Sequence, residues 1–116
     1  PNNHSWKKVI ENMVDLLFLK DEFNNKFVLD FIKKTREYFY ILFITNINVK
    51  KILSNLMISL IMRIDSIHVK HEVIKIISKY EQRISQGTRY IVHLEAMMLD
   101  ILSFLQKSKN NLFIIS

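Results

Sequence analysis

The sequence predicts an all-α domain, a compact bundle of four to five antiparallel helices. Only one glycine and one proline occur in 116 residues, and the proline stands at position 1. Sandwiches, barrels and glycine-rich phosphate loops need these residues for turns with positive φ and for breaks with a fixed φ. Because 49% of the residues are nonetheless hydrophobic, the chain has to consist of long regular elements, and its apolar residues recur at helical spacing.

The first two helices are predicted from apolar stripes behind favourable caps. The first helix follows Ser5, a good N-cap, and ends near residues 20–21. The second begins at Asn24 or Asn25 and runs to about Ile44. Its inward face carries Phe27, Val28, Phe31 and Ile32, and the face opposite them is charged.

The third helix follows Asn48, and its apolar side chains cover more than half of its circumference, so we expect it to be the central helix. The fourth opens at Asp65–Ser66 and ends at Gln86-Gly87-Thr88, where Gly87 is a helix-stop signal and Thr88 is the N-cap of the next helix. The fifth runs into the polar stretch at 107–111. We predict inward positions on the fourth helix at Val69, Val73, Ile76, Ile77, Tyr80 and Ile84.

Two stretches have a strand as their alternative. Residues 38–44 and 112–115 are rich in aromatic and β-branched side chains and lack a helical polar gap. A helix explains the first stretch better, because it continues the second helix without a break. The second stretch is an apolar tail within residues 110–116, and its bulky side chains need burial.

The chain is long enough for a single domain, residues 1–116. Because it begins at Pro1 without a methionine, we expect it to be excised from a longer protein. Short connections between successive helices favour antiparallel neighbours. The alternative to a closed bundle is a pair of stacked helical hairpins of the HEAT or armadillo kind. Residues 25–64 and residues 67–106, which would be the two hairpins, share no repeated sequence pattern, so the bundle is favoured.

Composition excludes several classes of protein. The chain has no cysteine, so disulfide frameworks, thiol nucleophiles and cysteine-bound metals are absent. No apolar run is long enough to span a membrane, and no signal peptide is visible. We therefore expect an intracellular protein, cytoplasmic or nuclear. The net charge of +6 is spread along the chain, which is typical of a solvated surface rather than a concentrated binding site.

The sequence carries no motif for catalysis or for a cofactor. His68, His71 and Glu72 have helical spacing, but a structural zinc site needs four ligands and a catalytic one three. The acidic residues are scattered, and a chain with one glycine lacks the phosphate-binding and nucleophile-elbow motifs. We expect no enzymatic activity, no metal and no cofactor.

The favoured function is that of a protein–protein interaction module, an adaptor, a scaffold or a self-associating domain. Consecutive helical residues turn by about 100°, so the aromatic run at 38–43 points in several directions, and one of these is expected to be exposed. The exposed side of this run would bind another protein or a second copy of the chain. The candidate interface residues are Tyr38, Phe39, Tyr40, Phe43, Leu112 and Phe113.

The alternative function is nucleic-acid binding through basic residues of the second, third and fourth helices. If the second and third helices form an antiparallel hairpin, Arg63 lies level with the stretch around Lys33, and a mixed basic face results. Interleaved acidic residues argue against this alternative. Its candidate residues are Lys33, Lys34, Arg36, Arg63 and Lys70.

Overall fold

The computed structural model describes residues 5–86 and 90–110 and contains five helices in these ranges. They are α1 (Ser5–Leu17), α2 (Asn25–Ile44), α3 (Val49–Ile61), α4 (Ile67–Gln86) and α5 (Tyr90–Asn110). The predicted all-α class is confirmed, and within the described residues the stretch 38–44 is helix, not strand. The tail at 112–115, the predicted helix stop at Gly87 and the predicted N-cap at Thr88 lie outside the described residues.

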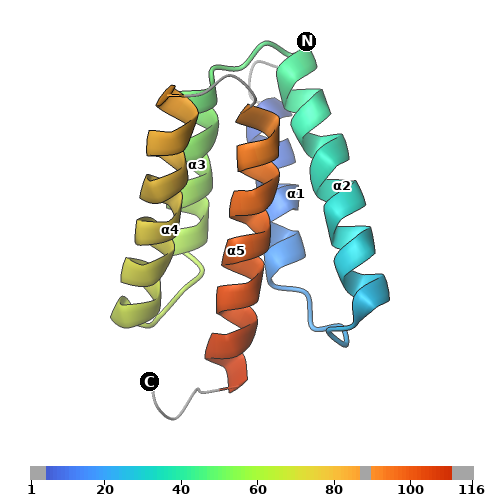
Figure 1. Ribbon diagram of the computed structural model, residues 1–116, viewed down its shortest axis with the longest axis vertical. Coiled ribbons are helices and arrows are strands. Elements are labelled where there is room, and N and C mark those ends of the chain that lie inside the picture. Colours follow the sequence, from blue (N-terminus) through green and yellow to red (C-terminus); the bar gives the residue numbers. More distant parts are fainter. Residues whose placement is uncertain (1–4, 87–89, 111–116) are drawn as a thin grey trace.

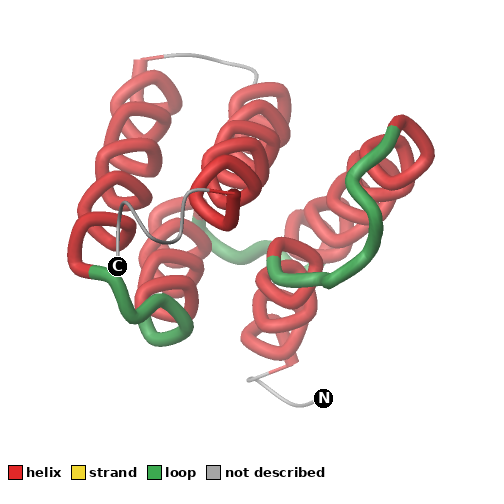
Figure 2. Tube along the Cα trace, turned by 90° about the horizontal axis from the view of Figure 1, so that it is seen from below, coloured by secondary structure: helices red, strands yellow, loops and turns green. Residues whose placement is uncertain are grey.

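The helices form a closed bundle in which α1, α3 and α5 run one way and α2 and α4 the other (Figure 1). α5 lies between α4 and α2, and α1 lies between α3 and α2 (Figure 2). The principal contacts join α4 with α5, α3 with α4, α2 with α5, and α1 with α2, α3 and α5. This closure confirms the compact bundle rather than two separate stacked hairpins.

The expectation that the third helix is central is wrong. α3 packs chiefly on α1 and α4, and both Ile58 in its last turn and its C-cap residue Met62 are exposed. α1 and α5 have three principal neighbours each and are the central elements. Apolar residues around most of a helix therefore do not require that all its sides be covered, because a folded protein keeps much apolar area at its surface.

The hydrophobic core receives side chains from all five helices. α2 contributes Phe31, Phe39 and Leu42, and also the hydroxyl of Thr35, which is buried without a hydrogen-bond partner. On α4, Val69, Val73, Ile77 and Tyr80 are buried as predicted, whereas Ile76 and Ile84 are half-buried. The remaining buried apolar residues are Ile10, Met13, Val14, Leu16, Leu17, Ile52, Leu53, Leu56, Leu60, Ile64, Leu94, Met97, Met98, Ile101, Leu102 and Leu105.

The predicted caps fix three helix starts. The side chain of Asn24 accepts a hydrogen bond from the Phe27 amide at 2.9 Å, and that of Asn48 accepts one from the Lys50 amide at 2.7 Å. Ser66 accepts one from the Val69 amide at 3.2 Å. Each cap satisfies a backbone N–H that the first turn of a helix leaves without a partner.

α2 ends in a Schellman motif built on an asparagine. Asn46 has φ of 60°, the left-handed conformation that glycine most often supplies. The Asn46 amide donates to the Phe43 carbonyl, and the Ile47 amide donates to the Leu42 carbonyl. Asparagine tolerates this conformation better than most residues, so a chain with one glycine still makes the sharp turn into α3.

Candidate interaction surface

Two side-chain contacts show the register between α2 and α5. Arg36 and Glu95 form an ion pair, with the Arg36 Nε 2.6 Å from the Glu95 Oε2. Near one end of the bundle the rings of Phe43 on α2 and Tyr90 on α5 meet edge to face, with centroids 5.3 Å apart. Because the helices are antiparallel (Figure 1), this register places Tyr40 level with Val92.

Exposed apolar side chains collect around this level of α2 and α5. Ile44 is 83% exposed, Tyr40 is 54% exposed and Val92 is 53% exposed. Ile41 and Tyr90 are also exposed. We call these five residues the α2–α5 patch: Tyr40, Ile41, Ile44, Tyr90 and Val92. An apolar group of this kind, with tyrosines among its members, is typical of surfaces that bind other proteins.

The interface residues predicted from sequence have different positions. Tyr40 is exposed and belongs to the α2–α5 patch, whereas Tyr38 and Phe43 are half-buried against the core. Phe39 is completely buried, so it is a core residue and not a surface anchor. Leu112 and Phe113 lie outside the described residues.

Sequence reasoning missed four members of the patch. Ile41 and Ile44 belong to the same run as Tyr40, and a helical wheel centred on Phe39 as a buried residue would have placed them outward. Tyr90 and Val92 carried no comparable signal. They join the patch only because α5 packs beside α2.

The basic residues of the alternative hypothesis do not come together as one face. Lys33, Lys34 and Arg36 lie on α2, and α1 stands between α2 and α3 (Figure 2). Arg63, after α3, and Lys70, on α4, therefore lie on the other side of the bundle. The hairpin assumed from sequence is wrong because α2 packs on α1 and α5, whereas α3 packs on α1 and α4.

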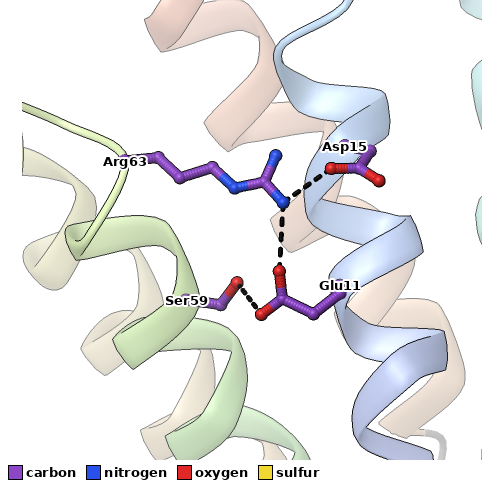
Figure 3. Close-up of polar contacts among 4 residues, drawn as sticks. All are labelled: Glu11, Asp15, Ser59 and Arg63. Carbon is purple, nitrogen blue, oxygen red and sulfur yellow. Dashed lines mark hydrogen bonds and ion pairs between the residues drawn. The ribbon is translucent and has the colours of Figure 1, made fainter.

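Arg63 instead belongs to a polar cluster that joins α1 to the end of α3. Its Nη2 lies 2.6 Å from the Asp15 Oδ1 and 3.0 Å from the Glu11 Oε2 (Figure 3). The Ser59 hydroxyl donates to the other carboxylate oxygen of Glu11 at 2.7 Å. Two carboxylates thus face this guanidinium, which makes Arg63 a structural cation rather than a free phosphate ligand.

The cluster changes the protonation equilibria of its members. The hydrogen bond from Ser59 lowers the pKa of Glu11, the Arg63 guanidinium lowers it further, and partial burial opposes both. Burial lowers the pKa of Arg63, but its hydrogen bonds to Asp15 and Glu11 outweigh that effect and raise it. Both shifts favour the charged forms, as expected for a structural ion pair.

A second polar contact ties α4 to α5. The Tyr80 hydroxyl donates to the Asp100 carboxylate, and the Lys79 Nζ lies 3.7 Å from the same carboxylate oxygen. Burial raises the pKa of Tyr80, and the negative charge of Asp100 raises it further. Tyr80 is consequently a neutral donor near pH 7 that satisfies its hydroxyl at the edge of the core.

No cluster of three metal-ligating side chains occurs in the described parts of the chain. His68 and His71 lie exposed on the first turns of α4. The helices described here also include none with the length and hydrophobicity to cross a membrane.

The described residues thus form an all-α bundle that carries exposed apolar side chains on two neighbouring helices. The chain belongs to the family described as "Replication factor C subunit 3, C-terminal domain", which it matches over residues 6–109. Curated proteins include no match to this chain. Family membership indicates protein–protein interaction within a complex and an intracellular role in DNA replication.

Proposed function

We propose that this domain is an assembly module, through which a replication factor C-type subunit binds a neighbouring subunit by its α2–α5 patch. The observation that carries the proposal is the exposed apolar group of α2 and α5 at the level of Tyr40 and Val92. The family's description of a subunit's C-terminal domain supports a role in assembly.

The composition of the patch fits an interface. Its centre consists of tyrosine and aliphatic side chains, and exposed charged residues, Lys33 and Glu37, lie on the same helix one to two turns away. Stable interfaces combine an apolar centre with a polar rim, and tyrosines contribute strongly to their affinity. The partner surface is expected to be apolar and helical, so that side chains of two helices interdigitate.

The test is assembly of the subunit that contains this domain with the other subunits of its complex, produced together and purified. Ile44→Asp places a charge at a position that is 83% exposed, and Met62→Asp places one at a position that is 82% exposed but lies at the end of α3. Light-scattering mass across size-exclusion chromatography reports assembly, and circular dichroism reports folding.

We expect Ile44→Asp to weaken assembly by about tenfold or more, which corresponds to about 1.4 kcal/mol. Met62→Asp should leave assembly unchanged, and both variants should keep their helicity. Equal assembly of the two variants would contradict the proposal. A salt-insensitive dimer of the chain alone that Ile44→Asp dissociates would identify a second copy as the occupant of the patch.

The proposal includes no chemistry of the domain's own and no cofactor. Nucleic-acid binding, the alternative from sequence, is not favoured by any arrangement of the basic side chains, because two of the five form ion pairs and the others are divided between α2 and α4. Should duplex DNA bind at low salt, a steep salt dependence that Lys33→Glu reduces would favour the alternative.

A further inference from the structure

A groove lies at the end of the bundle away from the α2–α5 patch. Its volume is about 780 Å³, within the range of pockets that hold small ligands or a few side chains. It lies where α1 and α3 end, α4 begins and α5 makes its last turns, at the lower end in Figure 1. Its apolar lining includes Phe18, Ile64, Ile67, Val69 and Leu105.

We propose that residues 112–115 of this same chain, Leu-Phe-Ile-Ile, bind in the groove. Lys109 and Ser108 on the last turn of α5 line it, and α5 ends at Asn110. The segment is therefore tethered within reach of the groove, because three extended residues beyond Asn110 span up to about 10 Å. Such a short tether gives an effective concentration on the order of millimolar.

Charge and polarity favour this occupant. Residues 111–116 contain no charged side chain and include four bulky apolar ones. The charged residues that line the groove have both signs, with Asp65 negative and Lys109 positive, and Arg63 is already paired with Glu11 and Asp15. A strongly acidic or basic ligand gains little from such a rim, whereas an uncharged apolar segment covers the lining and Ile67, which is 82% exposed.

The absence of cysteine in the chain allows a direct test by disulfide trapping. The double variant Ile67→Cys/Ile114→Cys pairs the groove with the tail. The control Met62→Cys/Ile114→Cys uses a position of equal exposure that is not part of the lining. Both are oxidised mildly at low protein concentration, and non-reducing electrophoresis separates intrachain from interchain products.

We expect the Ile67 pair to close within one chain about tenfold faster than the Met62 pair or more, since a disulfide requires Cα atoms within about 7 Å. Equal rates for the two pairs would overturn the proposal. Interchain products alone would also overturn it and would make a second copy the occupant.

A second measurement avoids substitutions in the groove. Deletion of residues 111–116 should shift the methyl resonances of Ile67, Val69 and Leu105 in an NMR spectrum and leave those of Ile44 in place. Unchanged groove resonances would show that the tail does not bind there. Neither experiment alters the α2–α5 patch, so the results of both are independent of whether that patch mediates assembly.

Discussion

Arg36 of α2 and Glu95 of α5 form a forked ion pair that joins the two helices. The Arg36 Nε donates to the Glu95 Oε2 at 2.6 Å, and its Nη2 lies 3.4 Å from the Glu95 Oε1. Fork-to-fork geometry fixes orientation as well as distance, so the pair marks which residues of α2 and α5 lie at one level. The alignment of Tyr40 with Val92 follows from this register.

We expect Arg36→Met to lower thermal stability slightly and to make it less sensitive to salt, because an exposed ion pair is screened by ions. Thermal melts at low and high salt check this. Lys33→Met, which removes a neighbouring exposed cation of α2, is the control. Equal salt dependence for the two variants would show that the pair does not stabilise the register.

Phe39 and Tyr40 are adjacent but have opposite roles. Phe39→Ala should lower the free energy of unfolding by about 3–5 kcal/mol, since it empties a fully buried site. Tyr40→Ala should change it by about 0.5 kcal/mol or less, as for most surface positions. Urea denaturation measures both values. Comparable losses would mean that Tyr40 is also a core residue.

Thr35 and Ser59 offer two buried hydroxyls with different surroundings. The Thr35 Oγ1 has no hydrogen-bond partner, whereas the Ser59 hydroxyl donates to Glu11. Thr35→Val should therefore be neutral or stabilise the fold by up to about 1 kcal/mol, and Ser59→Ala should destabilise it by about 1 kcal/mol. Chemical denaturation of both variants tests the contrast, and destabilisation by Thr35→Val would reveal a partner for its hydroxyl.

The lowered pKa of Glu11 makes stability depend on pH. The contribution of this carboxylate is fully present above the ordinary carboxyl pKa of 4.5 and is lost as the pH falls through the lowered value in the folded state. Because Glu11 is half-exposed, its contribution should remain below about 1 kcal/mol. Glu11→Gln and Ser59→Ala should each flatten the loss of stability below pH 4.5. If both variants kept the pH dependence of the native sequence, the ionised Glu11 would not stabilise the fold through this cluster.

Asn46 supplies the left-handed residue after α2. Asn46→Val should destabilise the domain by about 1–2 kcal/mol, because a β-branched residue is strained at positive φ. Asn46→Gly should be neutral or slightly stabilising, since glycine has no Cβ to clash. Thermal melts compare the two variants. Equal stability for Val and Gly at this position would show that the turn relaxes to another conformation.

Much of the local structure was predictable from sequence, and particular residues show why. Asn24, Asn48 and Ser66 act as the expected caps, because capping depends on a side chain and the amides two or three positions later. The inward positions of α4 were largely correct for the same reason, since helical periodicity is a property of the segment itself.

The candidate surface was only partly predictable. Tyr40 was among the expected interface residues and is exposed, but Phe39 beside it is buried. The sequence of 38–44 is apolar on every side of the helix, so no polar residue marks which side faces the core. That choice is made by α1 and α5, which pack against α2.

The sequence alone determined that the chain is helical, where several helices begin, and which faces of them are apolar, since these properties arise from interactions within a few residues. The tertiary structure decided which helices are neighbours. α1 packs between α2 and α3, and it thereby separates the basic residues expected to form one face. α5 packs beside α2 and brings Val92 to Tyr40. Such neighbours are chosen by the packing of apolar faces from distant segments, and no local pattern encodes that choice.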